Sequence, residues 1–253
     1  MSDDDTNWFG AGGADYAAHR PDYPAELAPL LAGLAPARNF AVDVGCGTGQ
    51  LTRRLAEHFG AVEGLDLSAD QIANATPAPG GAYRVGSESD TGLPDGVADL
   101  ITAAQAAHWF DLPAFYREVR RIAVDGALLA LITYGVTVID DDLTERFDRF
   151  YVDEIGPFWP PERRHVDNGY RDFDFPFERV DVDVPAIERS WTLDDFLGYL
   201  RTWSAVRNAE AQGQAGLLSA FAADLRELWG APDRRRTVAW PVTVLAGRVD
   251  RPR

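Results

Sequence analysis

The feature that most constrains the fold is a regular alternation of short apolar runs and helical segments, which begins near residue 24 and ends near residue 134. Short apolar runs bounded by glycine or polar residues are typical of buried strands, and apolar residues at helical spacing are typical of amphipathic helices. Strand–helix alternation predicts an α/β fold, with a parallel sheet covered by helices on both faces. The expected strands are 40–44, 61–66, 82–85, 98–102 and 127–134; the expected helices are 24–34, 48–59, 68–75 and 112–122.

Beyond residue 134 the alternation ends. The pattern predicts helices at 140–152, 192–208 and 217–229, a loop at 156–176, a strand of unknown partner at 179–184 and a last strand at 237–249. We therefore expect a core sheet that is completed by the C-terminal strand, with a helical segment inserted before it.

The charge balance excludes several functions. The chain has 40 acidic and 24 basic residues, a net charge of −16, and all of its basic residues are arginine. Nucleic acids and anionic membranes attract basic surfaces, so neither is an expected partner. The longest apolar stretch, 127–139, is too short to span a bilayer, and the acidic start is unlike a signal peptide. We expect a soluble, cytoplasmic protein.

Metal and disulfide chemistry are not expected either. Cys46 is the single cysteine, so the chain can form no internal disulfide and no cysteine zinc site. His19, His58 and His165 show no metal-ligand spacing with acids or with one another.

A glycine-rich loop separates the first expected strand from the first crossover helix. Gly45, Gly47 and Gly49 follow the G-x-G-x-G spacing, with Asp43 two residues ahead. Such a loop lets the backbone approach a ligand at the carboxyl end of the sheet. A dinucleotide fingerprint would need a third glycine at the position of Gln50.

Two carboxylates indicate which ligand this loop binds. Asp43 is poorly suited to a pyrophosphate and well suited to a positively charged ammonium. Asp66 ends the second expected strand, where an acid can accept hydrogen bonds from ribose hydroxyls. A ligand with an ammonium, a ribose and no phosphate is S-adenosylmethionine.

With these residues, the sequence resembles the class I S-adenosylmethionine-dependent methyltransferases, best over residues 14–135. Residues 16–24 (YAAHRPDYP), 105–111 (QAAHWFD) and 191–204 are similar to the branch that includes trans-aconitate methyltransferase-like proteins. The resemblance implies a Rossmann-like, doubly wound, mostly parallel seven-stranded sheet. It also implies one methyltransferase domain over 1–253: a lid segment at 1–23, a cofactor-binding core at 24–135, a substrate cap at 136–235 and a final strand at 236–253.

The resemblance also implies residue roles in cofactor binding. Asp43 would face the methionine ammonium, often through water, Asp66 would hold the ribose, and Leu67 would pack on the adenine. Glu88 departs from the pattern, because a small residue is common there. The full cofactor set is Tyr16, Arg20, Asp43, Gly45, Cys46, Gly47, Gly49, Asp66, Leu67, Ser87, Glu88 and Gln105.

His108 is the candidate catalytic base, because it follows the fourth strand and its ordinary pKa lies near neutrality. A lone histidine more often packs locally or shapes a substrate site, and that alternative is favoured about two to one. A carboxylate acceptor would need no base, whereas a phenol or a thiol could.

The substrate-binding candidates are Trp109, Tyr199, Arg201 and Trp203. Packing of the helix edge is an equally good explanation for Trp109, and a solvated helix face is the favoured one for Arg201. The resulting hypothesis is methyl transfer from S-adenosylmethionine to a small-molecule oxygen nucleophile such as a carboxylate, by a monomer or homodimer. The alternatives are an NAD(P)-dependent oxidoreductase and a non-catalytic S-adenosylmethionine-binding protein.

Overall fold

The computed structural model describes residues 21–250, so Tyr16 and Arg20 lie outside the described residues. The chain divides into two compact units. The core unit contains residues 22–135, 164–186 and 242–250, and the helical unit contains residues 136–163 and 187–241. Each unit is described by itself below.

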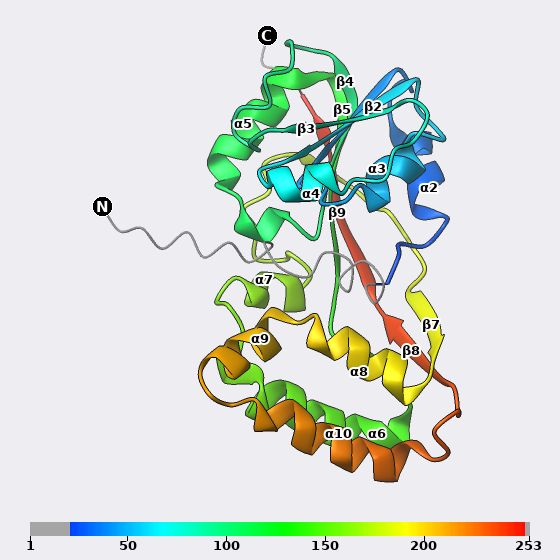
Figure 1. Ribbon diagram of the computed structural model, residues 1–253. Coiled ribbons are helices and arrows are strands. Elements are labelled where there is room, and N and C mark those ends of the chain that lie inside the picture. Colours follow the sequence, from blue (N-terminus) through cyan, green and yellow to red (C-terminus); the bar gives the residue numbers. More distant parts are fainter. Residues whose placement is uncertain (1–20, 251–253) are drawn as a thin grey trace. The chain divides into compact units, whose positions relative to one another are not determined.

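The core unit is built on a seven-stranded sheet with the order β3-β2-β1-β4-β5-β9-β6 (Figure 1). Strands β1 to β5 are parallel, and β9 is antiparallel to both of its neighbours, β5 and β6. The predicted mostly parallel seven-stranded α/β sheet is thus confirmed. The strands are β1 (Phe40–Val44), β2 (Ala61–Asp66), β3 (Gly81–Val85), β4 (Ala98–Ala104), β5 (Ala123–Tyr134), β6 (Glu178–Val180) and β9 (Val242–Val249).

Local sequence explains where the crossover helices begin. Ser68 caps α4 by accepting a hydrogen bond from the Gln71 backbone, and Asp111 caps α5 in the same way from Ala114. The helices of the core unit are α2 (Leu27–Leu34), α3 (Gln50–Leu55), α4 (Ala69–Ala73) and α5 (Leu112–Ile122), with a 3₁₀ turn η1 (Ala107–Trp109) after β4.

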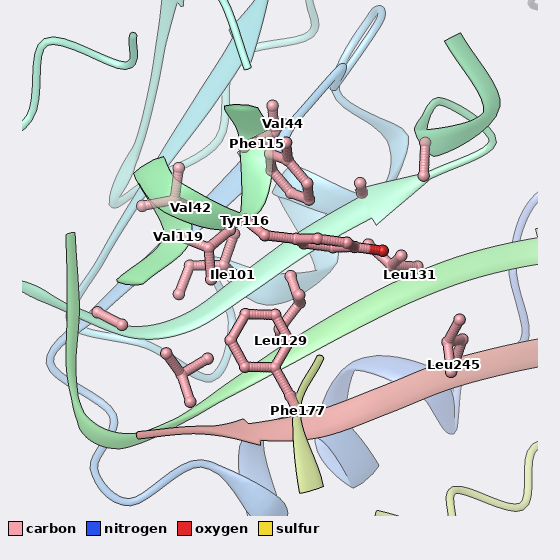
Figure 2. Packing of buried hydrophobic residues seen from close by; sticks show 14 of the residues in the cluster. Val42, Val44, Ile101, Phe115, Tyr116, Val119, Leu129, Leu131, Phe177 and Leu245 are labelled. Carbon is pink, nitrogen blue, oxygen red and sulfur yellow. The ribbon is translucent and has the colours of Figure 1, made fainter. Parts of the chain in front are cut away.

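The hydrophobic core lies between the central strands and α5. Figure 2 shows Phe115, Tyr116 and Val119 of α5 among side chains of β1, β4 and β5. Apolar runs on β4 and β5 are buried almost without interruption, as expected for parallel strands that are covered on both faces.

Residues 164–186 belong to the core unit, although the sequence interpretation places them in the inserted cap. Val166, Tyr170, Phe173 and Phe177 pack into the core cluster, and this apolar burial explains the difference. The expected strand of unknown partner is β6, which pairs with β9 at the edge of the sheet.

The expected final strand 237–249 is two strands. β8 (Arg236–Trp240) pairs with β7 (Ile187–Trp191) in a separate two-stranded sheet of the helical unit, and β9 begins after Pro241. Proline has no backbone N–H to donate to a ladder, so it separates the two strands.

The helical unit contains α6 (Asp141–Asp148), a π-helical segment η2 (Arg149–Glu154), a 3₁₀ turn η3 (Gly156–Phe158), α8 (Leu193–Arg201), α9 (Ser204–Ala211) and α10 (Gly216–Trp229); α7 (Arg163–Asp167) follows at its boundary. The expected helix 192–208 breaks at Trp203, whose extended backbone starts α9. The buried guanidinium of Arg236 ties β8 to Asp140 and Asp142 at the start of α6. Within residues 21–250, no helix has both the length and the apolar character that a membrane crossing requires.

Candidate functional site

The glycine loop after β1 is folded back over the end of β2. The backbone N–H groups of Gly45 and Cys46 both donate to the carbonyl of Leu65, at 2.7 and 2.9 Å. Gly45, Gly47 and Gly49 have φ angles of 70°, 55° and 84°, in the left-handed region that glycine adopts without a steric penalty. These backbone angles favour glycine at all three positions of the motif.

Close contacts add a second requirement at two of these glycines. A Cβ on Gly45 would lie 2.4 Å from the Cβ of Ala106, and one on Gly49 would lie 2.4 Å from the Tyr83 hydroxyl. The residues after β4 and on β3 therefore press directly on the loop. At these two positions glycine is required by packing against protein atoms. The space beside Gly47 is open, since the nearest atom, Gln71 Oε1, is 3.8 Å from where a Cβ would lie, so this part of the loop backbone can be approached closely by a ligand.

Asp66 fixes this loop at the end of β2. One of its carboxylate oxygens accepts from the Gly47 backbone at 2.9 Å, and the other accepts from the Ser68 backbone at 2.8 Å. Each carboxylate oxygen has two lone pairs, so both can accept further bonds. The half-buried carboxylate is therefore able to hold a pair of ribose hydroxyls.

Asp43 is buried at the end of β1, where it is 1% exposed. Its two oxygens accept hydrogen bonds from the hydroxyls of Thr52 and Thr102, each at 2.7 Å. Burial raises the pKa of Asp43 to about 6, against the lowering effect of the two hydroxyls. A cation near the loop would favour the charged carboxylate, and its role toward an ammonium stays a prediction.

This raised pKa predicts a pH-dependent stability. The folded state binds the Asp43 proton more tightly than the unfolded chain, so this group destabilises the fold increasingly as pH rises from about 4 to 7. Without ligand, the free energy of unfolding of Asp43→Asn relative to that of the wild type should therefore rise by about 2–3 kcal/mol between pH 4 and pH 7. Urea unfolding of both proteins at several pH values measures this, and a difference that does not change with pH would contradict it.

The residues expected around an adenine lie at the carboxyl ends of β2 and β3. Leu67, the residue after β2, is 68% exposed, which is a high value for a leucine. Val85, the last residue of β3, is also exposed. Ser87 donates a hydrogen bond to the Glu88 carboxylate at 3.0 Å, so these two side chains contact one another. Their contact with a cofactor stays a prediction.

Gln105 has an unusual backbone at the end of β4. Its φ is 55°, which is uncommon for a residue with a side chain. Its backbone N–H donates to Ile132, and its side-chain amide bonds to Thr133 and the Tyr134 carbonyl. β5 therefore holds this strained residue next to the glycine loop, since Ala106 follows it and contacts Gly45.

His108 lies in η1, after β4, and its Nδ1 is 3.0 Å from the hydroxyl of Tyr170. The neighbouring Trp109 ring is 4.9 Å from the imidazole and 40% exposed. A large exposed aromatic side chain beside a histidine suits a wall of a binding site. The roles of His108 as base and Trp109 as substrate contact stay predictions.

The other substrate candidates lie in the helical unit. Tyr199 and Trp203 are buried, and Tyr199 accepts a hydrogen bond from the Trp240 indole. Both rings pack in the aromatic core of that unit, which accounts for them structurally. Arg201 is exposed on α8. Their roles toward a substrate stay predictions.

The environment of Cys46 disfavours a nucleophilic thiolate. Burial raises the pKa of its thiol above the ordinary range, which favours the protonated form over the thiolate that attacks electrophiles. Among residues 21–250, no group of three His, Cys, Asp or Glu side chains is arranged to hold a metal ion.

Three residues of this region were not identified from sequence. Thr52 and Thr102 bind Asp43, and Tyr170 binds His108. A polar threonine within the apolar run of β4 is a signal that could have indicated Thr102. Tyr170 carries no such signal, because it lies 62 residues from His108 in the sequence.

Comparisons with known proteins show the family of the chain. Residues 42–131 match the family model of a methyltransferase domain. A protein of Dictyostelium discoideum named as a methyltransferase is 36% identical over 200 residues, which cover 78% of this chain and 76% of that protein. A malonyl-[acyl-carrier protein] O-methyltransferase of Geobacter sulfurreducens is 30% identical over 141 residues, which cover about half of each chain.

A solved structure also matches most of the chain. A protein of Anaeromyxobacter dehalogenans, named as a type II methyltransferase, is 44% identical, with a TM-score of 0.86. The alignment covers 92% of this chain and 99% of that one. These relatives exclude the nicotinamide oxidoreductase alternative and show that the chain belongs to the family of class I S-adenosylmethionine-dependent methyltransferases.

Proposed function

We propose that the protein transfers a methyl group from S-adenosylmethionine to an oxygen of a small-molecule acceptor, and that this oxygen belongs to a carboxylate. The glycine loop with Asp66 is the observation that carries the first part. The acceptor class is supported by the resemblance of residues 16–24 and 105–111 to the trans-aconitate branch, and by the malonyl O-methyltransferase among the relatives. The proposal includes a cytoplasmic monomer or homodimer.

The described residues suit this cofactor chemically. Backbone N–H groups at the start of α3 can donate to an anionic group of the cofactor, and Asp66 provides acceptors for ribose hydroxyls. Leu67 offers an exposed apolar surface for a flat ring. S-adenosylmethionine, when bound, supplies a methyl group on a sulfonium that is already an activated leaving group.

The chain's own residues then have mainly to align and to exclude water. A carboxylate acceptor is already deprotonated at neutral pH, so its oxygen could take the methyl group as the sulfonium–methyl bond breaks and S-adenosylhomocysteine leaves, and no proton would move. His108 would hold such an acceptor by a hydrogen bond rather than remove a proton, and Trp109 would shield it from water. A hydroxyl acceptor would instead pass its proton to the imidazole.

Removing the Asp66 carboxylate should weaken cofactor binding. We expect micromolar affinity for S-adenosylmethionine or S-adenosylhomocysteine in wild type, and a loss of about a hundredfold in Asp66→Ala, since charge-assisted hydrogen bonds contribute about 1.5–3 kcal/mol each. Gly47→Val should lose binding as well, because valine does not tolerate the backbone at φ 55°. Titration calorimetry measures both.

Asp70→Ala is the matched control, since it removes an exposed carboxylate from α4 and should keep wild-type affinity. Full affinity in both Asp66→Ala and Gly47→Val would overturn the site. The acceptor is tested separately, by detecting S-adenosylhomocysteine formed with panels of carboxylic acids, phenols, amines and thiols. If only a non-oxygen acceptor is methylated, the proposal that the acceptor is a carboxylate is wrong. Tight binding of S-adenosylmethionine without turnover of any acceptor would favour a non-catalytic protein.

A further inference from the structure

Tyr170 brings a buried hydroxyl to His108 from a distant part of the chain. Its side chain is 0% exposed, and the oxygen lies 3.0 Å from Nδ1 of the imidazole. A phenol that is removed from water needs a hydrogen-bond partner for its hydroxyl. Both residues belong to the core unit, so the contact lies within one compact body.

The backbone around Tyr170 is shaped to deliver this side chain. At the end of α7, Gly169 donates to the carbonyl of Val166 and Tyr170 donates to that of His165, the pairing of a Schellman motif. Tyr170 itself then has a φ of 61°, a left-handed conformation that is sterically unfavourable for a residue with a side chain. A tyrosine occupies this position, although glycine or asparagine adopts such a backbone more readily.

Packing holds the tyrosine ring in place. Phe173 stacks on it with ring centroids 4.5 Å apart and an interplanar angle of 11°. The imidazole of His108 is in turn flanked by Trp109. Strained backbone that persists because its surroundings fix it is concentrated at functional sites. The hydroxyl is therefore held at one nitrogen of His108. Among the residues that the structure describes, this is the only histidine that directly follows the carboxyl end of a core strand.

A hydrogen bond at Nδ1 restricts rotation of the imidazole ring. Because the tyrosine hydroxyl can donate to Nδ1 or accept from it, the bond persists in either neutral tautomer. Nε2 lies on the opposite edge of the ring, so its direction is set by the partner of Nδ1.

We propose that Tyr170 is a positioning residue, whose hydroxyl fixes the rotamer of His108 so that Nε2 is presented to the methyl acceptor. This inference rests on the proposed function, because it assigns the acceptor to the neighbourhood of His108. Tyr170 acts through the imidazole and does not itself contact the acceptor.

A double-mutant cycle tests the coupling. Tyr170→Phe removes one oxygen and keeps the stacked ring, so it should keep wild-type affinity for S-adenosylmethionine and lower kcat/KM for the acceptor about tenfold. In a His108→Gln background, the same change should have no further effect, because the group that Tyr170 positions is gone. An equal fall in both backgrounds would overturn the proposal.

Tyr116→Phe is the matched control. Tyr116 is also a buried core tyrosine, packed edge-on against Phe175 and Phe177, and its hydroxyl has no hydrogen-bond partner among the described residues. Loss of that hydroxyl should leave kcat/KM unchanged. A tenfold loss in Tyr116→Phe as well would show a general packing effect and contradict a specific role for Tyr170.

A second measurement does not depend on turnover. The ring ¹⁵N shifts of His108, assigned by their absence in His108→Gln, report tautomer and hydrogen bonding directly. Tyr170→Phe should change them, whereas Tyr116→Phe should not. Unchanged His108 shifts in Tyr170→Phe would overturn the proposal, even if wild type methylates carboxylates. If wild type methylates no acceptor, the proposed function fails, while the shifts still decide whether Tyr170 sets the state of His108.

Discussion

Replacing Gly45 by alanine is expected to lower the free energy of unfolding by about 3–5 kcal/mol. Two costs add at this position. The φ of 70° lies in the left-handed region, which penalises any side chain by about 1–2 kcal/mol. The new Cβ would also lie 2.4 Å from the Cβ of Ala106, with the Phe110 ring at 3.4 Å, so the chain after β4 must move. Chemical unfolding monitored by circular dichroism measures the loss.

Gly47→Ala separates these two costs. Gly47 has a similar φ of 55°, but the nearest atom to its Cβ is the Gln71 side-chain oxygen at an ordinary 3.8 Å. Only the backbone penalty of about 1–2 kcal/mol should remain. If both alanine variants lose the same free energy, the contact with Ala106 does not restrain the loop.

The sequence predicts this part of the molecule well because its signals are local. The spacing of Gly45, Gly47 and Gly49 reflects backbone angles that hardly any other residue adopts. Ser68 and Asp111 mark helix starts by bonding to N–H groups only three residues away. Neither signal depends on distant parts of the chain, so both are visible in a single sequence.

The features that sequence did not reveal depend on long-range packing. Phe173 and Phe177 look like loop residues in their own segment, yet they complete the hydrophobic core beside α5. Tyr199 and Trp203 look like candidate substrate contacts, although their rings are buried among other aromatic side chains. A buried aromatic side chain gives the same sequence pattern in a core and in a binding site, so only the fold separates the two.

The pairing of Asp43 with Thr52 and Thr102 shows the same limit at the site itself. The motif identifies Asp43, but the two hydroxyls that satisfy it come from α3 and β4. Desolvation in that position, rather than the acid itself, is what raises its pKa to about 6. A motif therefore locates a group, while its electrostatic state follows from neighbours that the motif does not include.

Loss of Glu118 should destabilise the core unit. This carboxylate on α5 is 7% exposed and accepts four hydrogen bonds, two from Thr91 and two from Arg121. The Arg121 side chain is 35% exposed and also donates to Asp95 and to the Leu93 carbonyl. The main cost of Glu118→Ala therefore falls on the buried Thr91 groups that lose this acceptor, about 1–3 kcal/mol. Glu57→Ala, on the exposed end of the segment after α3, is the control and should stay within about 0.5 kcal/mol of wild type.

The same network should respond to pH with a definite sign. Burial by itself raises the pKa of Glu118, but hydrogen bonds from Arg121 and Thr91 outweigh it and hold the pKa below its ordinary range. A lowered carboxyl pKa contributes stability above the unfolded-state pKa of about 4.3, and that stability is lost as pH falls through the folded-state pKa. The free energy of unfolding of Glu118→Gln should therefore fall short of the wild-type value by less in acid than at pH 7, as urea unfolding from pH 7 downward would measure.

Thr91 anchors the loop of residues 86–97, which carries Ser87 and Glu88. Amide hydrogen exchange in this loop should therefore accelerate in Glu118→Gln at pH 7. A stability difference between Glu118→Gln and wild type that does not change with pH would show that the Glu118 carboxylate does not stabilise the folded state by its charge. Unchanged amide exchange in residues 86–97 would show that this carboxylate does not anchor the loop.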